Sequence, residues 1–160
     1  MRVAFRKAHH HGLRVLASPA VKPARKKTAA TNRSVVIVDD QKPFVDLMAK
    51  MIGDNLDCPV HPFTRPTDAL RSLPKISPGV IVTDYYMPQM NGIEFIREAS
   101  GLAPEAVFII VSGHDLDMFD DELSRLKRLR MRIQKPFGWR PLADAVLKVW
   151  PGDDLPSFRE

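Results

Sequence analysis

The sequence predicts an α/β fold in which a five-stranded parallel sheet carries helices on both faces. From Ser34 onward, short runs of β-branched and aromatic residues alternate with segments whose apolar residues recur at helical spacing. The runs are almost continuously apolar, which is typical of strands buried on both faces. Strands that alternate with helices, without internal repeats, indicate parallel β-α-β units.

Five runs are predicted as strands. Pro59 and Pro62 bracket the second run, which favours an edge position because proline has no N–H to donate to a sheet. The predicted strands are Val35–Val38, Val60–Phe63, Val80–Thr83, Ala106–Val111 and Met131–Gln134.

Five helical segments separate and follow these strands. Pro43 stands in the first turn of the first segment and Pro141 leads into the last. The residues at helical spacing in the first segment are Phe44, Leu47, Met48, Met51 and Ile52. A short helix over 68–73 and a helix over 92–99 that ends near Gly101 follow. The fourth segment is marked by Leu116, Phe119, Leu123, Leu126 and Arg130, and the fifth by Leu142, Ala145, Val146, Val149 and Trp150.

Length and composition indicate one domain with a well-buried core. The longest uncharged apolar stretch is Ala106–Val111, far below the ~20 residues of a membrane-spanning helix. The single cysteine, Cys58, excludes an internal disulfide framework and fits a reducing compartment. We therefore expect a cytoplasmic protein without membrane insertion.

Positive charge is concentrated at the N-terminus. Residues 1–33 contain nine Lys and Arg and no acidic residue, whereas residues 34–160 contain 15 basic and 19 acidic residues. This composition predicts a basic, disordered arm over 1–33, a domain over 34–150 and a short tail over 151–160. We expect no nucleic-acid binding except through the arm.

Polar side chains stand where four of the strands end. Asp39 and Asp40 follow the first strand and Asp84 the third, while Ser112 and Lys135 end the fourth and fifth. The carboxyl ends of parallel strands meet at one edge of the sheet, near the point where the strand order reverses. We therefore expect the acids, the hydroxyl and the lysine to lie together.

These residue types suit phosphoryl transfer. Three neighbouring carboxylates repel one another unless a cation joins them, and Mg²⁺ prefers oxygen ligands together with phosphoryl oxygens. Lys135 offers a compact charge for phosphate, and Ser112 offers a neutral donor. A carboxylate held there can itself act as the nucleophile and form an acyl phosphate.

Each residue also has a simpler interpretation. Asp39 and Asp40 could cap the first helix, Asp84 could be an ordinary loop carboxylate, and Lys135 could be a solvated strand end. These interpretations would all have to hold together, on different strand ends, so the phosphoryl-transfer interpretation is preferred.

The segments "VVIVDD", "VIVTDYYMPQMNG", "VFIIVSG" and "QKPF", in this order and spacing, resemble the receiver domain of two-component response regulators. The resemblance covers about residues 34–150 and implies a flavodoxin-like (βα)5 fold. It also implies that a phosphohistidine of a partner histidine kinase or histidine phosphotransferase is the phosphoryl donor.

The resemblance assigns roles by position. Asp84 matches the phospho-acceptor, and Asp39 and Asp40 match the Mg²⁺-binding acid pair. Ser112 matches the hydroxyl that contacts the phosphoryl group, and Lys135 the lysine of the family. The main-chain carbonyl of Tyr86 matches a further metal ligand. The side chains of Tyr86 and His114, each two residues beyond a site residue, stand where the family controls access of water to the acyl phosphate.

The sequence departs from the family pattern at Arg132. The family usually carries an aromatic residue there, whose swing is coupled to the hydroxyl, but a guanidinium cannot be buried unpaired. Arg132 therefore either replaces this switch or simply stays exposed. Arg128 and Arg130 stand close to Arg132 in the sequence. These three arginines form either a solvated face or a docking surface for an acidic partner.

The sequence is compatible with four functions. The preferred one is a single-domain, Mg²⁺-dependent phospho-acceptor that signals by protein contact, or a carrier in a phosphorelay, and is not itself an enzyme. A degenerate receiver that binds a partner without phosphorylation is the alternative. A haloacid-dehalogenase-type phosphatase would require a second acid where Tyr86 stands. Binding of nucleic acid through the arm is the fourth.

Overall fold

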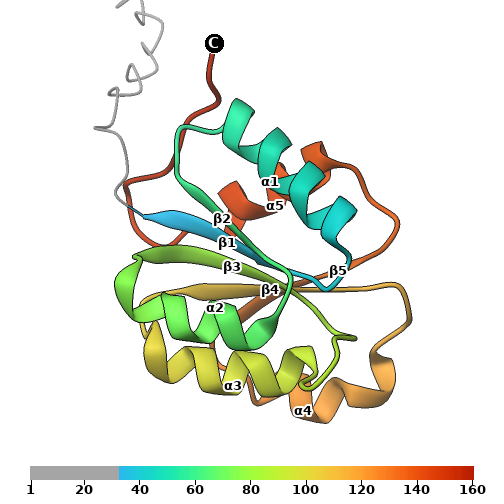
Figure 1. Ribbon diagram of the computed structural model, residues 1–160. Coiled ribbons are helices and arrows are strands. Elements are labelled where there is room, and N and C mark those ends of the chain that lie inside the picture. Colours follow the sequence, from blue (N-terminus) through green and yellow to red (C-terminus); the bar gives the residue numbers. More distant parts are fainter. Residues whose placement is uncertain (1–32) are drawn as a thin grey trace, which may run out of the picture.

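Five parallel strands form one sheet in the order β2-β1-β3-β4-β5 (Figure 1). The computed structural model describes residues 33–160, so the predicted arm lies outside the described residues except for Arg33. The strands are β1 (Ser34–Val38), β2 (Val60–Phe63), β3 (Pro78–Asp84), β4 (Val107–Ser112) and β5 (Leu129–Gln134). All five predicted strands are confirmed, and β2 is at an edge as expected.

Helices cover both faces of this sheet. Figure 1 shows α1 and α5 on one face and α2, α3 and α4 on the other. The helices are α1 (Lys42–Asn55), α2 (Pro66–Ser72), α3 (Gly92–Leu102), α4 (Asp120–Ser124) and α5 (Trp139–Val149), and the short 3-10 turns are η1 (Leu73–Lys75) and η2 (Asp117–Phe119). The predicted fold class is therefore confirmed. No helix within residues 33–160 is long and apolar enough to cross a membrane.

The core consists of two layers because side chains on a strand alternate between the faces of the sheet. Along β1, Val36 and Val38 belong to the layer under α2, α3 and α4, whereas Val35 and Ile37 belong to the layer under α1 and α5. β3 and β4 are buried along their whole length. The sheet is therefore a rigid base for residues at its ends.

Three predictions about the helices are wrong in detail. In α1 the buried residues are Val45, Met48 and Ile52, while Leu47 is 53% exposed. The helix α3 ends at Leu102, next to Gly101 as expected, but extends three residues beyond the predicted span of 92–99. The fourth helical segment has only one short α-helix, and Arg130 lies in β5.

The C-terminal residues pack against the domain. Leu56, just after α1, forms an antiparallel bridge with Phe158. The backbone N–H of Asp57 donates to Ser157 (2.9 Å), and that of Arg159 donates to Asn55 (2.8 Å). The guanidinium of Arg140 lies 4.4 Å from the centre of the Phe158 ring. The tail therefore joins the end of α1 to the start of α5.

Candidate phosphoryl-transfer site

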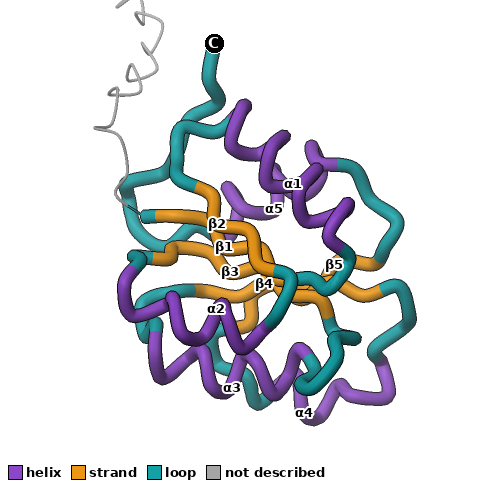
Figure 2. Tube along the Cα trace, viewed as in Figure 1, coloured by secondary structure: helices purple, strands orange, loops and turns teal. Residues whose placement is uncertain are grey.

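The ends of β1 and β3 lie side by side at the point where the strand order reverses. Val38 is in register with Thr83, and β2 and β3 lie on opposite sides of β1. In folds of this kind, ligands bind just beyond the carboxyl ends of the strands at such a point. Figure 2 shows the loops that leave this edge, at the right of the sheet.

Asp39 and Asp40, at the end of β1, occupy different environments. Asp39 is 1% exposed, and its Oδ1 accepts a hydrogen bond from the backbone N–H of Gln41 at 2.9 Å. Asp40 is exposed. Neither carboxylate caps α1, because Gln41 is the residue at the N-cap and α1 has no side-chain cap. The interpretation of these acids as helix caps is therefore wrong.

Asp84 is the last residue of β3 and is also buried. The backbone N–H of Tyr86 donates to its carboxylate. The following loop folds back tightly: the N–H of Gly92 donates to the carbonyl of Tyr85 at 2.8 Å, and Asn91 caps α3 in a capping box with Glu94. The third helix therefore starts at Gly92, as predicted, with Asn91 as its N-cap.

Ser112 and Lys135 are joined through the backbone. The N–H of Lys135 donates to the carbonyl of Ser112 at 2.7 Å, and the Lys135–Pro136 peptide bond is cis. The hydroxyl oxygen of Ser112 accepts a hydrogen bond from the backbone N–H of His114 at 3.0 Å. The serine and the lysine therefore occupy fixed positions beyond neighbouring strands.

The ammonium group of Lys135 joins the two buried acids. Its Nζ lies 2.5 Å from Oδ2 of Asp39 and 2.8 Å from Oδ1 of Asp84. It also lies 4.6 Å from the centre of the Phe44 ring. Burial lowers the pKa of Lys135, but hydrogen bonds to both carboxylates outweigh this and raise it overall. Lys135 is therefore charged over the whole physiological pH range.

One lysine does not neutralise this edge. Burial raises the pKa of Asp84, and the charge of Asp39 adds to this effect, while the hydrogen bond from Lys135 opposes it. The net direction of the pKa is upward, because burial outweighs the ammonium of Lys135. A second cation beside Asp84 would supply further positive charge.

The donor set of this edge fits a hard divalent cation. The carboxylates of Asp39, Asp40 and Asp84 and the main-chain carbonyl of Tyr86 are all oxygen donors, which Mg²⁺ prefers. In the part of the chain that the structure describes, no three His, Cys, Asp or Glu side chains are close enough together to hold a metal by themselves. Waters and the phosphoryl oxygens would therefore complete the coordination, as is usual for Mg²⁺.

The raised pKa of Asp84 predicts a pH-dependent gain in stability for Asp84→Asn. A raised pKa in the folded state means that the folded protein binds the proton of Asp84 more tightly than the unfolded chain does. The stability that the protonated carboxyl contributes is therefore lost as the pH rises through that pKa. We expect Asp84→Asn to raise the free energy of unfolding at pH 7 by about 1 kcal/mol. The gain should disappear below about pH 4, where the unfolded carboxyl is also protonated.

Urea unfolding between pH 4 and pH 8 measures this difference. The control is Asp40→Asn, which removes the same charge from an exposed position of the same edge. An equal gain in both variants would show that net charge, rather than the burial of Asp84, is the cause.

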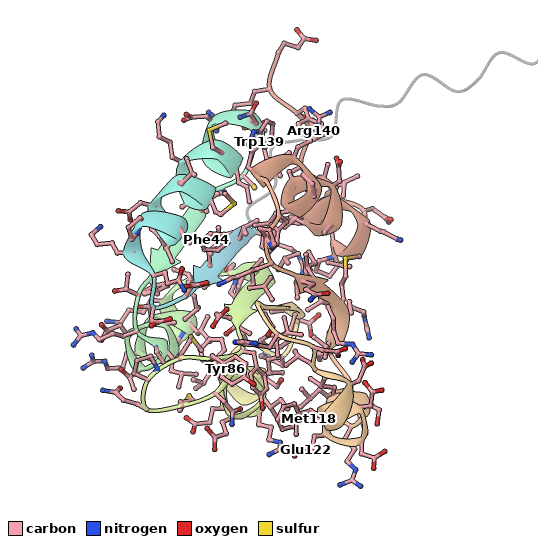
Figure 3. All side chains as sticks on the ribbon, turned by 90° about the vertical axis from the view of Figure 1, so that its right-hand side faces the viewer. Phe44, Tyr86, Met118, Glu122, Trp139 and Arg140 are labelled. Atoms are coloured by element: carbon pink, nitrogen blue, oxygen red, sulfur yellow. The ribbon has the colours of Figure 1, made fainter. Side chains whose placement is uncertain are left out.

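A series of aromatic rings borders the site. The ring centres of Tyr86 and His114 lie 5.3 Å apart, those of Tyr85 and Tyr86 4.6 Å, and those of Tyr85 and Phe119 5.0 Å. Tyr86 is half exposed while Tyr85 is buried. In Figure 3, which looks onto the right-hand side of Figure 1, Phe44 and Tyr86 lie above and below the sheet edge. The sequence did not indicate the contact of Phe44 with Lys135.

Arg132 is exposed and pairs with α4. Its guanidinium lies 2.5 Å from Oδ1 of Asp120. It also borders a cavity of about 150 Å³ that Ser112, His114 and Gln134 help to line. The expectation that a guanidinium is not buried unpaired therefore holds, and the ion pair links β5 to α4 where the family usually has an aromatic residue.

A comparison with protein families finds that residues 35–147 match the response regulator receiver domain. The chain belongs to this family. It is a receiver domain of two-component signalling, a family in which phosphorylation is typical. The fold is that of a signalling phosphoacceptor domain, and such domains are generally not enzymes.

Relatives and solved structures agree with this assignment. The chain is 33% identical over 84 residues to the transcriptional regulatory protein FixJ of Rhizobium meliloti, covering 52% of this receiver and 41% of FixJ. It is 25% identical over 135 residues to the sensor kinase CckA of Brucella abortus, covering 83% of this receiver and 14% of CckA. The receiver thus spans less than half the length of these relatives.

Among solved structures, a CheY-like receiver domain from Methanospirillum hungatei JF-1 matches with a TM-score of 0.64 and 21% identity, covering 74% of this chain and 93% of that one. This likeness shows that the two proteins share the fold.

Proposed function

We propose that this receiver accepts a phosphoryl group on the carboxylate of Asp84 from a phosphohistidine of a partner histidine kinase or phosphotransferase. The observation that carries the proposal is the buried pair of Asp39 and Asp84 around a single ammonium group. Such a site places fixed positive charge directly beside a carboxylate that can react. Signalling then follows through contact with other proteins.

In the proposed reaction, an oxygen of Asp84 attacks phosphorus as the bond from phosphorus to the histidine nitrogen breaks. An acyl phosphate forms on Asp84, and the histidine leaves with the electron pair of that bond and takes up a proton. Lys135 moves from two carboxylates towards the new phosphoryl oxygens, and the hydroxyl of Ser112 donates to another. Mg²⁺, when held by Asp39, Asp40, Asp84 and the Tyr86 carbonyl, supplies further positive charge.

The direct test is the intact mass of the protein after incubation with Mg²⁺ and acetyl phosphate. We expect one added phosphoryl group (~80 Da), formed through the carboxylate nucleophile and absent in Asp84→Asn and in the presence of a chelator. The control variant Asp40→Asn distinguishes the acceptor from the metal-binding acids. Its labelling should recover at higher Mg²⁺ concentrations, whereas Asp84→Asn should not be labelled at any Mg²⁺ concentration. Unchanged mass in the wild type, together with no Mg²⁺ binding, would favour the phosphorylation-independent module instead.

Tyr86 and His114 should slow hydrolysis of the acyl phosphate. Their rings meet edge to face at 5.3 Å beside Asp84, where they limit the approach of water. We expect Tyr86→Ala and His114→Ala each to speed loss of the phosphoryl group by roughly tenfold, which corresponds to about 1.4 kcal/mol of barrier. The measurement is the decay of the added mass after the donor is removed.

A suitable control is Met118→Ala, because Met118 is 82% exposed nearby but has no part in the ring contacts. Hydrolysis as fast in this variant as in Tyr86→Ala would contradict a shielding role.

A further inference from the structure

Cations without a carboxylate partner are concentrated in one short stretch. Of the 16 Lys and Arg side chains in residues 33–160, ten form ion pairs with acidic side chains. The six others are Lys75, Arg125, Lys127, Arg128, Arg130 and Lys148. Four of these six lie between residues 125 and 130, which we call the basic stretch.

The basic stretch leads directly into the edge of the sheet. It joins α4 to β5, and β5 is the last strand in the order β2-β1-β3-β4-β5. An edge strand has a row of backbone N–H and C=O groups that no neighbouring strand pairs. The basic stretch starts directly after α4 and overlaps the first residues of β5, so its cations and the edge of β5 are close together along the chain.

A groove of about 320 Å³ lies between α4 and β5. Leu123, Leu129 and Met131 provide its apolar lining, and Asp120, Arg130 and Arg132 its charged lining. Along β5 the side chains alternate: Arg130, Arg132 and Gln134 are exposed, while Leu129, Met131 and Ile133 are half-buried. The groove therefore combines an apolar floor with a basic rim.

The nearby acids leave Arg130 without a carboxylate partner. Asp120 pairs with Arg132 at 2.5 Å, and Glu122 pairs with Arg97 of α3 at 3.1 Å. Arg130 is held in place because its guanidinium donates to the backbone carbonyl of Lys127 at 2.9 Å. The guanidinium has further N–H groups available for a ligand. Unpaired positive charge therefore remains just after the C-terminal end of α4, whereas the acidic residues of α4 lie in its first turn.

We propose that the edge of β5 and the basic stretch bind an extended, acidic segment of a partner protein. The segment would add a strand to β5 through its backbone and pair its carboxylates with Arg125, Lys127 and Arg130. Its alternate apolar side chains would enter the groove beside Leu129 and Met131. This proposal deepens the proposed function and rests on it, because it names the chemistry of the partner that this receiver contacts.

An acidic protein segment fits better than nucleic acid. Residues 33–160 carry 16 basic against 19 acidic side chains, a net charge of −3. Long polyanions depend on positive charge over a wide surface, and their binding is governed by the number of phosphates neutralised. The acidic first turn of α4, with Asp120, Asp121 and Glu122, would repel such a ligand beside the basic stretch. A short segment held partly by backbone hydrogen bonds avoids that repulsion.

The test uses the full chain and a labelled ten-residue peptide of alternating Glu and Val. A peptide of the same length and charge, with proline in place of every valine, serves as a probe that cannot pair as a strand. We expect binding of the first peptide by fluorescence anisotropy, weaker binding at high salt, and slower hydrogen exchange of amides in Leu129–Gln134. The proline peptide should bind at least about tenfold more weakly because it lacks the backbone donors.

Two double variants decide whether the site is specific. Arg125→Gln with Arg130→Gln should reduce affinity for the peptide by roughly tenfold. Lys75→Gln with Lys148→Gln removes the same charge from exposed, unpaired cations elsewhere and should leave affinity unchanged. Equal losses in both variants, or no binding at millimolar peptide, would each overturn the proposal.

Phosphorylation is tested separately in the same proteins. The variant Asp84→Asn should bind the peptide although it gains no mass from acetyl phosphate, and the Arg125 and Arg130 double variant should gain mass although it binds poorly. Failure of the docking surface is thereby distinguished from failure of phosphoryl transfer.

Discussion

Lys135→Met is expected to destabilise the protein by about 3–5 kcal/mol at pH 7, the usual cost of removing one partner of a buried ion pair. Lys135 contacts both Asp39 and Asp84, so the substitution leaves two buried carboxylates next to each other without their cation. It should also abolish phosphoryl uptake. Urea unfolding gives the stability, and intact mass gives the uptake.

The pH dependence identifies the cause. Without Lys135 the pKa of Asp84 rises further above its ordinary value, so the variant should regain stability as the pH falls and one carboxyl takes up a proton. Adding Asp84→Asn should recover much of the loss at pH 7, because one of the two charges is removed. A loss that neither low pH nor the second substitution relieves would indicate a packing defect instead.

Gly92→Ala is expected to destabilise the protein by about 1–3 kcal/mol, the range for overpacked sites. A Cβ atom at Gly92 would lie 2.7 Å from the backbone carbonyl oxygen of Asp84 and 3.0 Å from the Cα of Tyr85. These are backbone atoms, so α3 and the end of β3 would have to separate. Because Asp84 is the proposed acceptor, phosphoryl uptake should fall together with stability.

Gly101→Ala is the matched control, because Gly101 lies in the same helix and a Cβ atom there has no neighbour within 4 Å. Alanine is the better helix former by about 1 kcal/mol, so this variant should be equally or more stable and should take up phosphate normally. Loss of stability in both variants would mean that α3 tolerates alanine at neither glycine. The close approach to the carbonyl oxygen of Asp84 would then not explain the effect of Gly92→Ala.

The strands and the gathering of the site residues followed from the sequence, because buried parallel strands are apolar throughout and end in polar residues. Asp39, Asp84, Ser112 and Lys135 could be placed at one edge for this reason alone. The contact of Lys135 with both buried acids could not be predicted. It depends on the loop after β5, whose course is fixed by tertiary packing.

The errors have physical causes as well. Leu47 fits the helical spacing as well as Val45 does, and only the position of α1 on the sheet decides which of them is buried. Arg130 continues the apolar spacing of the fourth helix by its position, yet it belongs to β5. The predicted span of α3 stopped at residue 99, but the helix continues to Leu102, because a glycine inside a helix costs only about 1 kcal/mol and packing of the buried face outweighs this.

The tyrosines and tryptophans lie in different parts of the fold, which is useful for spectroscopy. Its two tyrosines, Tyr85 and Tyr86, both follow the proposed acceptor, whereas its two tryptophans, Trp139 and Trp150, pack in the layer of α1 and α5. Tryptophan fluorescence, excited at a wavelength where tyrosine does not absorb, therefore reports on the layer of α1 and α5 and not on the residues that follow Asp84. One unlabelled sample can thus show whether a change at Asp84 reaches the other face of the sheet.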